Sequence, residues 1–202
     1  MKISARDIDH LSLTLSDPGA TASRLLPLGF NLTPDGVEPR CICFQPDQDD
    51  VPNYIELLQG HPAVVAVALN VTELEGEERT HAWETEDGFE VDAGVVVGES
   101  GGPLAWFPVR HETPDAFMEP EWIVHPNGAL AMMAIHAVAE EPREVAKALP
   151  AVVGATIAIE RSPPLQALLR ANNVSFEVGE DKRVLVGPEQ AGGLMLEFMP
   201  QT

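Results

Sequence analysis

The order of predicted elements repeats along this chain, and this repeat constrains the fold more than any other feature. Residues 11–15 alternate leucine with serine or threonine, a period of two that is typical of a half-buried strand. A helix is predicted next, because Asp17 can cap its N-terminus, Pro18 suits its first turn and Gly29 can end it. Short strands complete the unit, over residues 30–33, 40–44 and 53–59. The first 60 residues therefore read as one β-α-β-β-β unit.

A similar order begins again at Ala63. Residues 63–71 form an apolar strand, and residues 72–83 are predicted to be a helix because Thr72 and Glu75 have the spacing of a capping box. Two strands follow, over residues 89–98 and 103–111, before a connector that prolines interrupt.

A third start lies at Leu130. Its predicted strands and helices alternate as strand 130–139, helix 140–149, strand 155–160, helix 163–173 and strands 183–187 and 193–199. Three divergent β-α-β-β-β units explain this order better than one large sheet does. The sequence therefore predicts an α+β fold with boundaries at residues 1–60, 61–129 and 130–202.

Charge and composition narrow the range of partners. The formal net charge of −20 repels phosphate groups, so nucleic acid and anionic membranes are not expected partners. The apolar fraction of 45% is typical of a globular protein. Cys41 and Cys43 lie two residues apart on a strand, where a relaxed disulfide does not form, so we expect buried free thiols. Without a basic-then-apolar leader or an apolar run of membrane length, a cytoplasmic location is expected.

Four predicted strands have an apolar face and place one histidine or glutamate on the other face. These residues are His10, Glu56, His136 and Glu197. If each helix covers the apolar face of its sheet, two imidazoles and two carboxylates converge on the opposite side, and this donor set suits a divalent transition metal. The alternative is that these side chains are hydrated or hydrogen-bonded on an open sheet, which is common for His and Glu on strands.

Several segments resemble a known superfamily. The stretches "IDHLSLTLSDPGATASRLLPLGF", "NYIELL" and "GGLMLEF" resemble signature segments of the vicinal oxygen chelate superfamily, and "EWIVHPNGA" resembles the central motif of its glyoxalase-like domain proteins. The resemblance implies paired β-α-β-β-β modules whose curled, mostly antiparallel sheets form half-barrels around a metal-binding cavity, with helices on the outer face. It implies metal ligands on the first and last strands of the modules.

By this resemblance, His10 and Glu56 match the ligands of the first module and Glu197 matches the last-strand ligand of the final module. His136 fits less well, since aligning Pro18 with Pro142 places Ala134, and not His136, opposite His10.

The middle unit departs from the pattern because its first strand supplies no ligand, although Glu121 and His125 follow later. An alternative metal set of His10, Glu56, Glu121 and His125 therefore stays open. Four further residues are candidates for binding substrate: Tyr54, His111, Trp122 and His125. For the histidines a hydrogen-bonded position in a loop is an equally good explanation, and for Trp122, as for Trp106, a place in the core is.

The resemblance also implies a chemistry. A divalent ion, such as Ni, Zn, Mn or Fe, would chelate two adjacent oxygens of a small-molecule substrate and stabilise an enediolate. Glu56 or Glu197 would act as the general base of a glyoxalase-type lyase or isomerase. Epimerisation next to a carbonyl and extradiol ring cleavage use similar parts, and a non-catalytic protein that binds small ligands is the second class of function. An odd number of modules leaves one without an internal partner, so a homodimer is expected.

Overall fold

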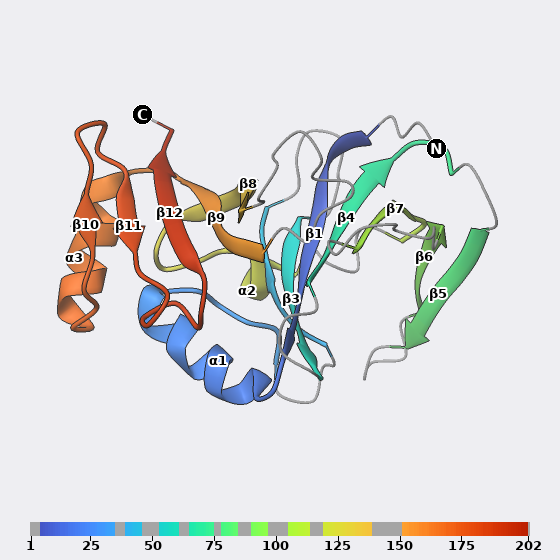
Figure 1. Cartoon of the computed structure of the whole chain (residues 1–202), viewed down its shortest axis with the longest axis horizontal. Helices are drawn as coiled ribbons and strands as arrows, with labels where there is room; N and C mark the ends of the chain where they lie inside the picture. Colours follow the sequence, from blue (N-terminus) through green and yellow to red (C-terminus); the bar gives the residue numbers. More distant parts are fainter. Residues whose placement is uncertain are drawn as a thin grey trace.

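The computed structural model describes residues 5–34, 39–45, 53–60, 65–74, 78–84, 90–96, 105–113, 119–138 and 151–201. These residues form two mixed β-sheets with helices packed around them (Figure 1). No helix among them is long and apolar enough to cross a membrane.

The larger sheet, here called the N-terminal sheet, has the strand order β2-β3-β1-β4-β7-β6-β5. Its strands are β1 (Ala5–Leu15), β2 (Arg40–Cys43), β3 (Tyr54–Gln59), β4 (Val65–Val71), β5 (Glu78–Glu84), β6 (Glu90–Val96) and β7 (Ala105–His111). The pairs β1–β3 and β4–β7 are parallel, and the other neighbours are antiparallel. The middle segment therefore extends the sheet of the first unit.

The C-terminal sheet has the strand order β10-β11-β12-β9-β8. Its strands are β8 (Ala129–Val138), β9 (Ala151–Ile159), β10 (Glu177–Val178), β11 (Val184–Val186) and β12 (Met195–Pro200). Only β9–β12 is parallel here, so seven of the ten strand pairs in the two sheets are antiparallel. The predicted α+β fold class with mostly antiparallel sheets is confirmed.

The two sheets contain corresponding units. In the first, β1 leads through α1 (Pro18–Leu25) to β2 and β3, and β3 returns parallel to β1. In the second, β9 leads through α3 (Ser162–Ala171) to β10, β11 and β12, and β12 returns parallel to β9. An additional antiparallel strand, β4 or β8, lies on the free edge of each first strand. Corresponding residues of the two units can therefore be compared by their register.

The helices begin and end as local chemistry dictates. The Asp17 side chain accepts a hydrogen bond from the Ala20 amide at 2.8 Å, and Pro18 occupies the first turn of α1, as predicted. The chain then tightens into the short 3-10 helix η1 (Leu26–Leu28), which ends at Gly29 in the left-handed conformation. The remaining helix, α2 (Pro120–Ile123), is a single turn.

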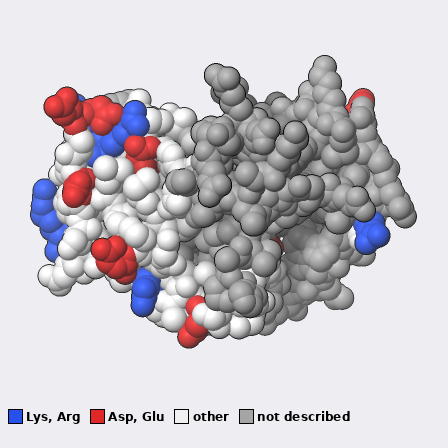
Figure 2. Space-filling view, viewed as in Figure 1, with Lys and Arg blue, Asp and Glu red and all other residues white. Residues whose placement is uncertain are grey.

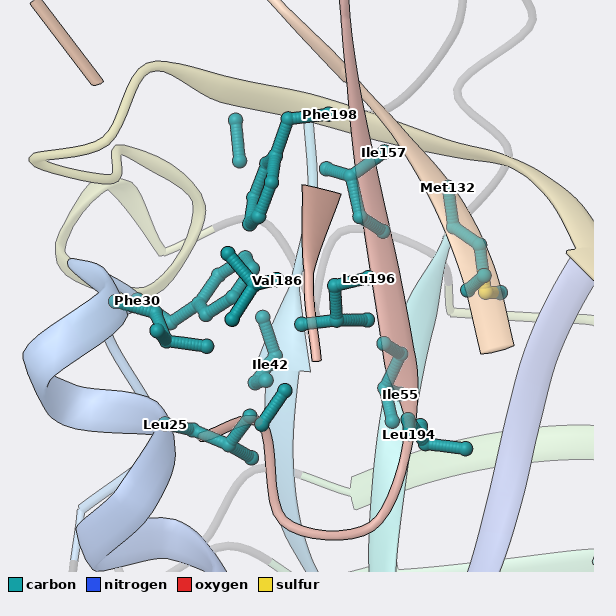
Figure 3. Close-up of a cluster of buried hydrophobic side chains, with 14 of the residues drawn as sticks. Leu25, Phe30, Ile42, Ile55, Met132, Ile157, Val186, Leu194, Leu196 and Phe198 are labelled. Atoms are coloured by element: carbon teal, nitrogen blue, oxygen red, sulfur yellow. The ribbon is translucent and has the colours of Figure 1, made fainter. Parts of the chain in front are cut away.

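One apolar core joins both units. It contains residues of both sheets together with α1, η1 and α3, and part of it is drawn in Figure 3: Leu25, Phe30, Ile42, Ile55, Met132, Ile157, Val186, Leu194, Leu196 and Phe198. The rings of Phe30 and Phe198 stack across the units with centroids 5.9 Å apart. Burying each such side chain stabilises the fold by about 1.5–3 kcal/mol, so each unit depends on the other.

The predicted helix over residues 72–83 is wrong. Residues 72 and 73 form a bend and β5 begins at Glu78, in an antiparallel pair with β6. The capping-box spacing of Thr72 and Glu75 is a local signal, and pairing with a neighbouring strand overrides such a signal.

The elements also differ at two other places. Residues 30–33 form no strand, although the Thr33 amide donates to the Cys41 carbonyl oxygen at 2.9 Å. The sequence predicts residues 130–139 as the first strand of the C-terminal unit, but the strand that leads into α3 and pairs with the last strand is β9. The predicted helix over residues 140–149 lies outside the described residues.

We predict that Gly29→Ala lowers the free energy of unfolding by about 1–3 kcal/mol. Gly29 has a φ of 83°, and a Cβ there would lie 3.0 Å from Asn127 Cβ and 3.1 Å from Leu168 Cδ1. Urea denaturation followed by circular dichroism measures the loss.

Gly19→Ala is the matched control. Gly19 lies in α1, and a Cβ there would meet only the Asp17 carboxylate, at an ordinary 3.5 Å. This variant should be as stable as the parent or more stable, since alanine favours a helix. Equal losses in the two variants would contradict the role given to Gly29.

Candidate functional site

A bulge in β1 places an acidic residue beside His10. The register between β1 and β4 shifts from Ile8↔Leu69 to His10↔Ala68, which leaves Asp9 as the extra residue. Because a bulge interrupts strict alternation, adjacent side chains can meet, and His10 Nδ1 lies 2.7 Å from Asp9 Oδ1. Asp9 is fully buried and His10 is 7% exposed.

Asp9 is the centre of a buried polar cluster, which we call the Asp9 cluster. Its carboxylate contacts His111 Nε2 of β7 at 3.1 Å through Oδ1 and at 3.0 Å through Oδ2. The side-chain amide of Asn70 in β4 donates to Oδ2 at 3.3 Å. Three neighbouring strands, β1, β4 and β7, thus each contribute a polar side chain.

These contacts keep Asp9 ionised. Burial alone would raise the pKa of a carboxyl group, but hydrogen bonds from His10 and His111, with the charges of the two rings, hold the pKa of Asp9 well below its usual range.

Aromatic rings surround the histidines. The Tyr54 ring stacks on His10 with centroids 4.5 Å apart and meets His111 edge-on at 6.5 Å. Phe107 meets His10 edge-on at 5.7 Å. Burial and the nearby Asp9 charge raise the pKa of Tyr54, so its phenol stays protonated. Trp122 packs with Ile123 against the Tyr54 side of β2 and β3.

Glu56 lies on the same face of the N-terminal sheet as His10 and Ser12. Ser12 and Glu56 are partners in the parallel β1–β3 pair, and Ser12 Oγ donates to Glu56 Oε2 at 2.6 Å. The Glu56 side chain is half-buried. No described residue donates a hydrogen bond to its second oxygen, Oε1.

The C-terminal sheet repeats this pair. Thr156 and Glu197 are partners in the parallel β9–β12 pair, and Thr156 Oγ1 donates to Glu197 Oε2 at 2.6 Å. Since the threonine hydroxyl has one proton, His136 Nε2, at 2.7 Å, is the donor to Thr156. Arg183 Nη1 donates to the other oxygen, Glu197 Oε1, at 2.9 Å.

Arg183 distinguishes the two carboxylates. Burial tends to raise the pKa of Glu197, but hydrogen bonds from Thr156 and Arg183 and the arginine charge lower it overall. Both of its oxygens are engaged, whereas Glu56 has one described partner.

The register explains the offset of His136. Ser12 corresponds to Thr156, so the counterpart of His10 is Gly154, which pairs with Met195. A Cβ at Gly154 would collide with the Met195 carbonyl oxygen, so a histidine does not fit there without a backbone shift. His136 instead comes from β8, opposite Gly154.

The four predicted metal ligands form two pairs. His136 Nε2 lies 3.8 Å from Glu197 Oε2 in the C-terminal sheet, and His10 and Glu56 share a face of the N-terminal sheet. Among the described residues, no group of three or more His, Cys, Asp or Glu side chains could hold a metal ion. The four-ligand site stays a prediction.

His125 has a structural position. Its Nδ1 accepts from the Asn31 amide at 3.0 Å, so Nε2 carries the proton and donates to the Cys43 carbonyl oxygen at 2.8 Å. Burial lowers the pKa of His125 to about 4, against the smaller opposing effect of the bond to Cys43. Both ring nitrogens are thus engaged by the backbone, while Glu121 is exposed on α2.

The charged residues on the described part of one face are mixed in sign (Figure 2). On the described part of the face seen in Figure 2, acidic and basic side chains lie close together among uncharged atoms. The net charge of −20 is therefore not gathered into one acidic patch on that part of this face.

The comparisons with known proteins match solved structures alone. No family model matches the chain, and no curated protein does. The chain is similar to a xylose isomerase-like TIM barrel/4-hydroxyphenylpyruvate dioxygenase fusion protein, with a TM-score of 0.47 and 11% identity over 96% of this chain. It spans about half of that protein, 49% of its length.

Two further matches are a glyoxalase I variant from Zea mays and a methylmalonyl-CoA epimerase variant from Streptomyces coelicolor. The first has a TM-score of 0.29 and 10% identity over 97% of this chain and 68% of that one. The second has a TM-score of 0.23 and 12% identity over 98% of this chain and all of that one, and its structure contains 2-nitronate-propionyl-CoA. These three TM-scores all lie below 0.5.

Sequence reasoning missed Asp9, Thr156 and Arg183. Strict alternation would place Asp9 on the core face with Leu11, and an acidic residue at such a position was a signal of a bulge. Thr156 could have been found by aligning β9, and not β8, with β1. Nothing local in the sequence indicates the partner of Arg183.

We predict that His125 makes folding stability depend on pH. Its folded-state pKa of about 4 lies below the ordinary 6.5, so the unfolded chain takes up the proton first. This contribution is complete above pH 6.5, and about 3 kcal/mol of unfolding free energy is lost as the pH falls to 4.

Urea denaturation at a series of pH values measures this effect. His125→Gln keeps a hydrogen-bonding side chain that does not titrate, so the variant should lose less stability across the same interval. The same pH slope in variant and parent would exclude His125 as the source.

Proposed function

We propose that the polar face around His10, Ser12 and Glu56 is the substrate site of a glyoxalase-like lyase or isomerase acting on a small molecule with vicinal oxygens. The observation that carries the proposal is the difference between two equivalent carboxylates. Glu197 is held by Thr156 and Arg183, whereas Glu56 has one described donor, Ser12, and its second oxygen has no donor among the described residues.

Glu56 is the better general base of the two. Arg183 stabilises the charged form of Glu197 and so weakens its tendency to take a proton. Glu56 would remove a proton from the hydroxyl-bearing carbon next to a substrate carbonyl and return it to the former carbonyl carbon, while the hydroxyl proton passes to the former carbonyl oxygen. This transfer isomerises the substrate without another reactant, and returning the proton to the opposite face of the same carbon would epimerise it.

A divalent metal, Ni, Zn, Mn or Fe, stays a prediction. His10 and Glu56 have the right donor chemistry, and a histidine held by a carboxylate at one nitrogen is typical of metal ligands. The number of donors does not fit, because the described residues bring no third ligand to this pair. No step is therefore assigned to a metal, and an extradiol dioxygenase has no specific support among the described residues.

A non-catalytic protein that binds small molecules is the second candidate. The observation in its favour is the same shortage of described metal donors, together with the stacked rings of His10 and Tyr54 beside the site. A homodimer and a cytoplasmic location stay predictions.

We predict that Glu56→Gln lowers catalysed exchange of a carbon-bound proton at least 100-fold, the order of effect expected of a general base. Proton NMR in D₂O measures exchange with a panel of hydroxy ketones, hemithioacetals and α-branched acyl thioesters. Elemental analysis of untagged protein purified without chelator gives the metal content in parallel.

Glu197→Gln is the matched control, since it makes the same chemical change at the equivalent register position. It should retain exchange within about three-fold, a change of less than 1 kcal/mol in barrier. Equal losses in both variants would contradict the choice of Glu56 as base. Absence of exchange in the parent, with tight binding of a panel member, would instead support the binding protein.

A further inference from the structure

We propose that Asp9 is a positioning residue that fixes the tautomer of His10, with Nδ1 protonated and Nε2 left as the acceptor. The inference rests on the proposed function for its catalytic meaning, but the tautomer itself follows from the contact of His10 with an ionised carboxylate. Asp9 is fully buried and takes its contacts from β1, β4 and β7.

The direction of the hydrogen bonds follows from the carboxylate. An ionised carboxylate accepts and never donates. His10 Nδ1, 2.7 Å from Asp9 Oδ1, must therefore carry a proton, and so must His111 Nε2, at 3.0–3.1 Å. In the neutral His10 ring the remaining nitrogen, Nε2, is then the acceptor.

The orientation of the ring is also constrained. Tyr54 stacks on one face of His10 at 22° between planes, and Phe107 meets the ring edge-on at 69°. With Nδ1 tied to Asp9, rotating the ring would break a charge-assisted hydrogen bond in a buried site, which is costly.

The tautomer of His10 determines which substrate group its Nε2 can bind. An unprotonated Nε2 accepts a hydrogen bond from a hydroxyl group or binds a cation, and it does not donate to a carbonyl oxygen. The site should therefore recognise a substrate hydroxyl on the His10 side, next to the carbon from which Glu56 removes a proton. Substrates with a hydroxyl group at this position form a narrower class than all small molecules with two vicinal oxygens.

The middle segment also contributes to the Asp9 cluster, through His111. His111 of β7 donates to Asp9, and β7 reaches β1 through β4. The segment that supplies no first-strand ligand thus helps to hold the carboxylate that orients His10.

The tautomer can be read directly by NMR. In protein labelled with ¹⁵N at histidine, a long-range ¹H–¹⁵N spectrum at mildly alkaline pH distinguishes a protonated from an unprotonated ring nitrogen, and loss of signals in His10→Gln assigns the ring. We expect protonated Nδ1 and unprotonated Nε2. The opposite pattern in the parent protein would overturn the proposal, even if no variant of Asp9 folds.

Asp9→Asn tests the cause, because the amide can donate as well as accept. The variant should lose the Nδ1-protonated signature and lower proton exchange about 10–100-fold, as expected when a carboxylate behind a functional histidine is removed. Asp7→Asn is the matched control, since Asp7 is exposed and, among the described residues, accepts a hydrogen bond from the Ile8 amide alone. Persistence of the signature in Asp9→Asn would contradict the proposal.

The outcomes separate this inference from the proposed function. If the tautomer is as expected but Glu56→Gln leaves exchange unchanged, the inference holds and the proposed function fails. If His10 shows a protonated Nε2 while Glu56→Gln abolishes exchange, the inference fails and the proposed function stands.

Discussion

The parallel pairing of the first and last strands in each unit is the constraint on which the rest of the structure depends. It brings β3 beside β1 and β12 beside β9, so residues far apart in sequence become partners. Side chains alternate across a strand, so a fixed register also fixes which residues share a face. The apolar partners turn to a common core, and Ser12–Glu56 and Thr156–Glu197 meet on the opposite faces.

The two units have similar strand pairing, but the charged residues on their polar faces have different partners. In the C-terminal unit Arg183 neutralises Glu197, and the His136 hydrogen bond completes a satisfied network. In the N-terminal unit the buried charge is on Asp9, next to His10 in β1, and two histidines donate hydrogen bonds to it. A buried charge without such partners would be strongly unfavourable. The proposed division of labour therefore assigns reactivity to Glu56 and structural support to Glu197.

Much of the fold could be predicted because it depends on local signals. The leucine alternation of β1, the cap at Asp17 and the glycine at position 29 each act within a few residues, and all are present in the structure. The prediction of a helix over residues 72–83 was wrong because the pairing of β5 with β6 is a long-range effect. The position of Asp9 could not be derived from a period of two, since a bulge breaks that period. The partners of His136 required the correct choice of first strand, which periodicity alone does not provide.

The segment after α2, which contains His125 and Asn127, connects the two units. The Asn127 amide donates to the Gly29 carbonyl oxygen at 3.3 Å, and its side chain donates to the Leu28 carbonyl oxygen at 3.0 Å. His125 and Asn31 tie the same segment to the first unit. Phe30 and Phe198 also stack across the core, so the two units are joined by both hydrogen bonds and apolar packing. Two units that share one core are not independent, so a substitution in the core of one unit must also fit the packing of the other.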